Sequence, residues 1–342
     1  MNIWKLLNRL RQSLDVVHYL GDVNHLNFVV DNTVPGSRLH VHQYDPKIQW
    51  PDDLNVSVND PAVQLGGRVE FALGDFGQIS VDVPDASVTP RFHLNSDSGP
   101  SLGVRSRRVY LKGVTNLRDI GGYRTAAGVS SWDQTFRSDN LSSLTAEDWV
   151  HLRQLGVRRI IDLRNDDEVA ALPTKLPEHD DEFEIIRIPM KGEILGTTDA
   201  LDLIFKGAID SITTADMCSM YVELLESHEA DIMDALELLE ADDRPPTLVH
   251  CTAGKDRTGL VAAFYLLRMG VTLEDALYDY NRSNLLRTPA RITALKPKFE
   301  EAGIDLAQIL PFLSAPPAAF FAAVDWVRLN KPELVGGMFN AQ

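Results

Sequence analysis

One ten-residue run constrains the fold of this chain more than any other stretch. It reads His250-Cys251-Thr252-Ala253-Gly254-Lys255-Asp256-Arg257-Thr258-Gly259. The apolar segment Thr247-Leu248-Val249 before it is typical of a buried strand, and the apolar segment from Leu260 to Met269 after it predicts a helix that ends at Gly270. A loop between a strand and a helix can turn its backbone N–H groups towards one point, which the positive end of the helix dipole also faces. The run therefore predicts an α/β domain with an anion-binding loop at a helix N-terminus.

The side chains of the loop indicate a chemistry for this anion site. A cysteine near a helix N-terminus and a cation is expected to have a lowered pKa, and the thiolate is its nucleophilic form. Arg257 follows Cys251 with five residues between them, and its planar set of donors fits two phosphoryl oxygens. We expect Cys251 to attack phosphorus while Arg257 binds the phosphoryl oxygens.

The other loop residues have supporting roles in this interpretation. His250 is expected to orient the backbone behind the loop and to favour the thiolate, and Thr258 to donate a hydrogen bond to the sulfur when it leaves. Gly254 and Gly259 allow a tight backbone path. The residues expected to contact the bound phosphate are Thr252, Ala253, Gly254, Lys255, Arg257 and Gly259.

The loop resembles the signature of the cysteine-dependent protein tyrosine phosphatase superfamily, which is His-Cys, five residues, Arg, then Ser or Thr. Its Gly-Lys-Asp-Arg-Thr-Gly portion is similar to that of bacterial-type tyrosine and dual-specificity phosphatases. Further segments similar to that group are 116–123 (NLRDIGGY), 136–139 (FRSD) and 161–164 (IDLR), so the resemblance spans about residues 108–335. It implies a phosphatase domain that acts through a cysteinyl-phosphate intermediate without cofactor or metal. Sulfur-transfer loops of the rhodanese kind are a competing interpretation, but they usually hold fewer residues.

Two aspartates are candidates for the general acid. The Trp-Pro-Asp tripeptide that many members of the superfamily use does not occur in the sequence. Asp256 lies beside Arg257, and the resemblance implies that it protonates the leaving oxygen. Asp162 is expected to end a strand at the carboxyl edge of a parallel sheet, where ligands bind, although Arg164 is an obvious partner for its carboxylate. We favour Asp256.

Lys255 leaves the substrate class open. A lysine at this place resembles phosphatases that accept phosphoinositides, but it can equally offset the charge of Asp256. The expected partner is a protein or peptide that carries phosphotyrosine. Dual specificity or phosphoinositide hydrolysis is the alternative, and a module that binds phosphorylated ligands with poor turnover is the alternative from another class.

Composition limits the remaining possibilities. A chain of 342 residues with 44% hydrophobic content is long enough for two domains. The formal net charge of −16 argues against nucleic-acid partners, and no apolar run approaches the roughly 20 residues needed for stable membrane insertion. The only cysteines, Cys218 and Cys251, exclude a disulfide framework. A reactive thiolate fits a reduced, cytoplasmic compartment, while export and the oligomeric state are left open.

The first 107 residues predict a separate architecture. A stripe of apolar residues predicts an amphipathic helix within residues 1–24, which docks on its own protein or serves as a targeting or membrane-surface element. Short alternating segments between turn residues predict a small β-sandwich-like accessory domain over residues 25–107. His40 and His42 share one strand face without further metal ligands nearby, so we expect no metal site. The strands are expected at residues 28–30, 39–44, 54–58, 69–73, 79–83 and 91–94, with a further strand at 108–111.

Residues 108–342 predict the α/β phosphatase domain, a central and mostly parallel sheet flanked by helices. Thr145 is expected to cap a helix from Ala146 to Leu155 that stops at Gly156. Residues 191–214 have weak periodicity, so we interpret them as a mobile cover over the site. The remaining elements are expected to be strands at 157–161 and 184–189, and helices at 215–240, at 273–280 and up to residue 329.

Overall fold

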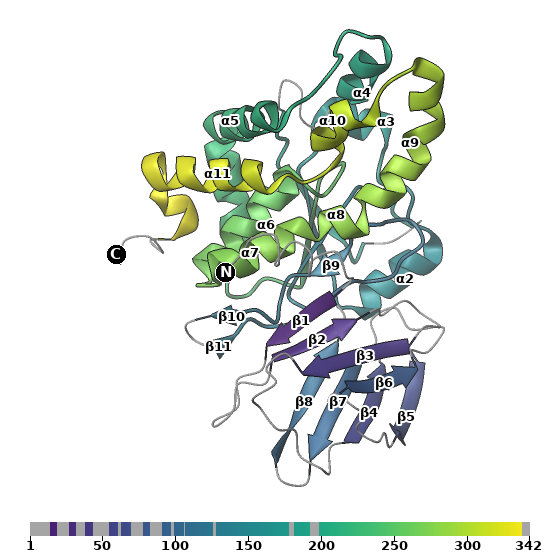
Figure 1. Ribbon diagram of the computed structural model, residues 1–342. Coiled ribbons are helices and arrows are strands. Elements are labelled where there is room, and N and C mark those ends of the chain that lie inside the picture. The colour runs from purple at the N-terminus through teal and green to yellow at the C-terminus, as the bar shows by residue number, and fades with distance from the viewer. Residues whose placement is uncertain are drawn as a thin grey trace. The chain divides into compact units, whose positions relative to one another are not determined.

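The computed structural model describes residues 107–336 apart from 126–127, 178–180 and 192–197, together with the backbone of eight strands between residues 14 and 105. The chain forms two compact units (Figure 1). One comprises Met1–Leu111 and Gly121–Trp132, and the other Lys112–Ile120 and Asp133–Gln342. The division therefore falls slightly after the boundary expected at residue 108, and Gly121–Trp132 joins the first unit.

A mixed five-stranded sheet forms the centre of the second unit. Its strand order is β14 (Glu184–Arg187), β13 (Arg159–Asp162), β15 (Thr247–His250), β12 (Thr135–Ser138) and β9 (Arg118–Asp119). Four of these strands run parallel, and β9 pairs antiparallel with β12 at the edge. The apolar residues of β13 and β15 are fully buried, as expected for a parallel sheet covered on both faces. This confirms a mostly parallel central sheet.

Helices flank this sheet in two groups. In Figure 1 one group has α6 between α5 and α7, with α11 along α5. The other group, at the opposite end of the unit, consists of α4, α9 and α10. The contacts between the helices agree with this grouping. The helices and their bounds are α2 (Ala146–Gln154), α3 (Asp166–Ala171), α4 (Thr198–Phe205), α5 (Thr214–Glu240), α6 (Arg257–Arg268), α7 (Leu273–Asn281), α8 (Ser283–Leu286), α9 (Thr288–Ala302), α10 (Leu306–Leu313) and α11 (Pro317–Asn330), followed by the 3₁₀ turn η1 (Pro332–Val335).

Local capping signals place the helix ends as predicted. The Thr145 side chain accepts a hydrogen bond from the Asp148 N–H, and Asp148 completes a capping box at the start of α2. Gly156 has a φ of +84°, which suits the chain reversal after that helix. The long helix predicted at 215–240 is confirmed as α5, with non-helical backbone at His228.

The predicted cover, residues 191–214, is partly a packed helix. Within it, α4 buries Ile204, and Phe205 lies with its ring centroid 5.2 Å from that of Phe299 on α9. Residues 192–197 lie outside the described residues. That this segment moves over the site stays a prediction.

Eight strands of the first unit form two antiparallel four-stranded sheets. One has the order β1 (Leu14–His18), β2 (Asn27–Asp31), β3 (Arg38–Gln43), β6 (Gln78–Asp82), and the other β5 (Val63–Val69), β4 (Asn55–Asp60), β7 (Arg91–Ser96), β8 (Gly99–Arg105). Five predicted strands overlap β2, β3, β4, β6 and β7. The side chains of these strands lie outside the described residues, so sandwich packing stays a prediction.

Several predictions for this region need correction. Leu14–His18 forms a strand where the amphipathic helix was expected, because Val16 and Val17 favour extended backbone and the segment pairs with β2. The rest of residues 1–24 lies outside the described residues. The strand β5 ends at Val69, where one was expected to begin, and residues 108–111 form no strand beyond a single bridge. Gly99 and Pro100 begin β8, which tolerates them because it is an edge strand.

No single helix in the described part of the chain is long and apolar enough to cross a bilayer. The helices α10 and α11 taken together reach the necessary length and composition, with a bend of 43° between them.

Candidate active site

The predicted anion loop lies between β15 and α6. Because β15 is flanked by β13 and β12, the loop emerges at the carboxyl edge of the sheet, near its middle. Cys251 is 1% exposed, and the Gly254 N–H donates to its Sγ at 3.2 Å. The strand, loop and helix predicted from the sequence are thus confirmed, with a backbone donor facing the sulfur.

Gly254 occupies a position that only glycine fits. Its φ is +66°, and a Cβ there would lie 2.3 Å from the Ser138 carbonyl oxygen. The Gly254 carbonyl accepts hydrogen bonds from Arg137 Nη2 at 2.7 Å and from Asn116 Nδ2 at 3.1 Å. These donors hold the carbonyl on the outside of the loop while the N–H of the same residue points at Cys251.

Asp279 on α7 anchors the residues that support the loop from behind. Its carboxylate accepts from Arg118 Nε at 2.9 Å and from Arg137 Nη1 at 2.6 Å, and all three side chains are buried. Burial acts to raise the pKa of Asp279, but the two guanidinium groups outweigh it and hold that pKa well below its usual value. Burial and the neighbouring Arg137 lower the pKa of Arg118 to about 10. The 116–123 and 136–139 segments therefore serve, through these contacts, to hold the loop.

Arg257 is clamped by a carboxylate that the sequence analysis missed. Its Nη1 donates to Glu168 Oε2 at 2.6 Å and its Nη2 to Glu168 Oε1 at 2.7 Å, while Nη1 also donates to the Leu163 and Met190 carbonyls. Burial acts to lower the pKa of Arg257, but Glu168 and Cys251 raise it above its ordinary value overall. Among the described residues Nε makes no hydrogen bond and Nη2 makes one, so both nitrogens retain an N–H for a bound anion.

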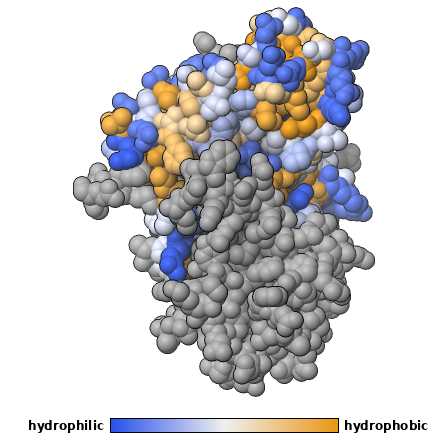
Figure 2. Space-filling view, viewed as in Figure 1, coloured by the Kyte–Doolittle hydropathy of each residue, from blue (hydrophilic) through white to orange (hydrophobic). Residues whose placement is uncertain are grey.

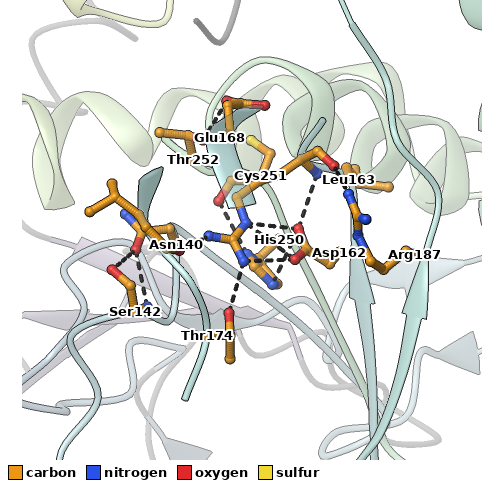
Figure 3. Close-up of polar contacts among 12 residues, drawn as sticks. Asn140, Ser142, Asp162, Leu163, Glu168, Thr174, Arg187, His250, Cys251 and Thr252 are labelled. Carbon is orange, nitrogen blue, oxygen red and sulfur yellow. Dashed lines mark hydrogen bonds and ion pairs between the residues drawn. The ribbon is translucent and has the colours of Figure 1, made fainter. Parts of the chain in front are cut away.

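Glu168 is itself positioned by the start of α3. Asn165 caps this helix by accepting from the Glu168 N–H, and the Glu168 carboxylate accepts from the Asn165 N–H, both at 2.9 Å. The Thr252 hydroxyl also donates to Glu168 (Figure 3). The Asn-x-x-Glu spacing is a capping-box signal visible in the sequence, but nothing local indicates that this glutamate meets Arg257.

The structure separates the two candidate acids. Asp162 is 3% exposed and accepts from Arg164 Nη2 at 2.7 Å, and His250 Nε2 lies 3.7 Å from its Oδ1. Figure 3 shows Asp162 beside His250, on the side of Cys251 away from Glu168. Burial acts to raise the pKa of Asp162, but Arg164 and His250 lower it overall. Arg164 engages both oxygens of this carboxylate, so neither is free to carry a proton to a leaving group.

Asp256 lies in the loop with one oxygen engaged. Its Oδ1 accepts from the Tyr221 hydroxyl at 2.7 Å and from Lys255 Nζ at 2.8 Å. Its Oδ2 makes no hydrogen bond to any of the described residues. The Tyr221 hydroxyl also lies 2.8 Å from that of Tyr280, so two buried tyrosines back the carboxylate.

Lys255 is buried, and its charge is already partnered. Besides its ion pair with Asp256, its Nζ lies 5.6 Å from the centroid of the Phe312 ring. Burial is the main cause of a lowered Lys255 pKa. This geometry favours the interpretation that Lys255 offsets Asp256.

Four further residues of the loop make contacts that agree with their predicted roles to different degrees. His250 is buried with Nδ1 3.2 Å from the Cys251 carbonyl oxygen, and burial lowers its pKa, which favours a neutral ring. The Thr258 hydroxyl is buried and makes no hydrogen bond to the described residues, so its predicted donation to the sulfur stays a prediction. A Cβ at Gly259 would lie 3.2 Å from the Tyr280 ring, so a larger residue there would crowd that ring. Ala253 contributes its carbonyl to Asn116 Nδ2 at 3.2 Å.

The described part of the chain has no group of three or more His, Cys, Asp or Glu side chains arranged to hold a metal ion. The side chains of His40 and His42 lie outside it. The metal-free mechanism stays a prediction.

Several known proteins resemble this chain. The sequence model described as "Tyrosine phosphatase family" matches residues 109–331. A tyrosine-protein phosphatase of Nostoc commune is 34% identical over 150 residues, which are 43% of this chain and 47% of that protein. The chain thus spans about half the length of that relative.

Two further comparisons cover more of the matched protein. The triple specificity protein phosphatase PtpB of Mycobacterium tuberculosis is 31% identical over 197 residues, 51% of this chain and 68% of that protein. The crystal structure of TpbA from P. aeruginosa shares 17% identity with a TM-score of 0.28, and the match covers 66% of this chain and 92% of that one. With its match to the family model over most of its length, this chain belongs to the tyrosine phosphatase family.

Proposed function

We propose that this chain hydrolyses phosphotyrosine in proteins or peptides through a cysteinyl-phosphate intermediate, without a metal ion. The observation that carries the proposal is the arrangement of Cys251 and Arg257. Cys251 faces a loop N–H, and Arg257 is fixed by Glu168 with N–H donors left on Nε and Nη2. This is the pairing of nucleophile and oxyanion donors that transfer of a phosphoryl group requires.

The proposed reaction has two steps. The Cys251 thiolate forms a bond to phosphorus while the bond to the tyrosine oxygen breaks, and Asp256 gives its proton to that oxygen. Arg257 and the loop N–H groups bind the phosphoryl oxygens. In the second step water attacks phosphorus, the Asp256 carboxylate takes its proton, and Thr258 donates to the departing sulfur. His250, as a neutral ring, orients the Cys251 backbone.

Turnover of defined substrates tests the proposal directly. Phosphate release is measured from a phosphotyrosine peptide, a phosphoserine peptide and a phosphoinositide under reducing conditions, with and without a chelator. We expect the tyrosine peptide to be hydrolysed fastest, with no effect of the chelator, and Cys251→Ser to abolish turnover while phosphate still binds. Normal turnover by Cys251→Ser would overturn the mechanism, and chelator-sensitive activity restored by metal would overturn its metal independence.

The choice of general acid is tested with leaving groups of different basicity. Asp256→Asn should lower kcat by about 10²- to 10⁴-fold on phenyl phosphate and much less on p-nitrophenyl phosphate, whose leaving group needs no proton. Asp162→Asn should instead lower thermal stability, because Arg164 loses its carboxylate. If Asp162→Asn alone showed the leaving-group dependence, Asp162 would be the acid.

Broader specificity is the second candidate. The name of the M. tuberculosis relative, a triple specificity phosphatase, favours it. The relative rates of hydrolysis of the three substrates above test this candidate. A burst of one phosphate per enzyme without further turnover would instead indicate a binding module.

The first unit and the compartment belong to the same proposal. We infer that residues 25–107 form an all-β accessory domain, which the two four-stranded sheets support. The thiolate mechanism favours a reduced compartment such as the cytoplasm.

A further inference from the structure

Arg287 and Arg291 form a pair of cations at the start of α9. Arg287 immediately precedes the first residue of the helix, and the Arg291 N–H donates to the Arg287 carbonyl at 3.0 Å, so the two residues lie one helical turn apart. Both are half-buried. Neither side chain makes a hydrogen bond or an ion pair with any residue that the structure describes, whereas Arg118, Arg137 and Arg257 each hold a carboxylate.

Hydrogen bonds attach this helix start to the anion loop. Asn116 Nδ2 donates both to the Gly254 carbonyl at 3.1 Å and to Ser283 Oγ at 3.2 Å, and the Ser283 carbonyl accepts from the Arg287 N–H at 3.1 Å. The backbone of Arg287 is therefore linked to the loop through two residues.

A second path joins the same helix start to Lys255. The Lys255 ammonium lies against the Phe312 ring on α10, and the next carbonyl, that of Leu313, accepts from Thr288 Oγ1 at 3.3 Å. Burial is the main cause that lowers the pKa values of Lys255 and Arg291, and the charge of Arg287 lowers both further. Arg287 is thus close enough to both cations for their charges to interact.

Of the three cations in this region, Lys255 alone has a carboxylate partner among the described residues. Lys255 is neutralised by Asp256, but two neighbouring guanidinium groups repel each other, and no carboxylate within the described residues compensates them. This occurs in a chain with a formal net charge of −16. Guanidinium groups present paired donors that match a carboxylate or a phosphate.

We propose that Arg287 and Arg291 bind a second anionic group of the substrate, a carboxylate or phosphate on the peptide that flanks the phosphotyrosine. The inference rests on the proposed function, because it assigns substrate selectivity to the same site. A peptide fits better than a lipid head group, since the acidic chain as a whole is repelled by an anionic membrane surface. Selectivity for acidic substrates then comes from α9 and not from Lys255.

The test compares two phosphotyrosine peptides that differ only in flanking Asp and Glu against Asn and Gln. The measured quantity is the ratio of kcat/KM for the acidic peptide to that for the neutral peptide. We expect a wild-type ratio of about ten, because a hydrogen bond to a charged group contributes roughly that factor. The ratio should fall towards one in Arg287→Gln, in Arg291→Gln and in the double variant, mainly through KM.

Lys296→Gln is the matched control, because it removes one positive charge from an exposed position on the same helix. It should keep the wild-type ratio. A wild-type ratio near one, or an unchanged ratio in the double variant, would overturn the inference while leaving the proposed function intact. Loss of phosphoinositide hydrolysis alone in the double variant would also overturn the inference, because it would indicate a site for lipid head groups. Failure of the wild type to hydrolyse either peptide would contradict the proposed function itself, and the inference would fall with it.

Discussion

Glu168 lies beneath Arg257, and both side chains are 2% exposed. A guanidinium group with four rotatable side-chain bonds has many orientations, and only some of them direct Nε and Nη2 towards a phosphate. The carboxylate of Glu168 selects one orientation by binding both Nη atoms. Glu168 is therefore a positioning residue that acts through Arg257.

Replacing this carboxylate tests that role. Glu168→Gln keeps the shape but removes the charge, so Arg257 should lose its fixed orientation and kcat should fall by about 10- to 100-fold. Breaking a buried pair should also lower the free energy of unfolding by about 3 to 5 kcal/mol. Steady-state kinetics and urea unfolding measure the two effects. Asp167→Asn, an exposed neighbour on α3, should change neither, and wild-type kcat in Glu168→Gln would contradict the positioning role.

Asp279 connects three elements, because it lies on α7 and binds Arg118 on β9 and Arg137 on β12. An element that contributes one carboxylate to two buried cations cannot move without leaving a charge unpaired. The loop carbonyl at Gly254 depends on Arg137. The packing of α7 on the sheet and the shape of the anion loop are thus coupled.

Stability against pH tests this connection. The folded pKa of Asp279 is depressed below the unfolded value of about 3.9, so its contribution is fully present above that value and is lost as the pH falls further. Asp279→Asn should lower the free energy of unfolding by about 3 to 5 kcal/mol at pH 7, and by less at about pH 3. Urea unfolding at the two pH values measures this. Glu274→Gln on the same helix is the control, and an equal loss at both pH values would contradict the depressed pKa.

At the scale of the whole molecule, the chain consists of two compact units, and the anion loop belongs to one of them. Units with separate cores can unfold in separate steps. A ligand stabilises only the unit that binds it. The two units should therefore respond differently to phosphate.

Calorimetry tests this expectation. Inorganic phosphate at about 100 times its Kd should stabilise the unit that contains Cys251 by about 2.7 kcal/mol and leave the other transition in place. Cys251→Ser should keep the shift, because the loop N–H groups and Arg257 remain. Arg257→Ala should lose it. A single transition that moves as a whole would show that the two units unfold together.

The sequence by itself determined the features that depend on neighbouring residues. Cys251 and Arg257 are joined by one loop, so their spacing was sufficient to predict a strand, a loop and a helix around an anion site. The capping box at Thr145 and the stop at Gly156 are equally local. The alternation of helices and strands predicted the mostly parallel sheet for the same reason.

Only the tertiary structure decided which distant side chains complete the site. Glu168 is 89 positions from Arg257, and Asp279 is 161 positions from Arg118, so their pairing depends on strand order and helix packing, which no local pattern records. The same holds for Arg287, whose place near Lys255 follows from how α8, α9 and α10 pack. Tertiary pairing also overrode the helical periodicity at Leu14–His18, where the backbone hydrogen bonds to β2 form a strand instead. Periodicity identifies the face of an element, but long-range packing determines what that face meets.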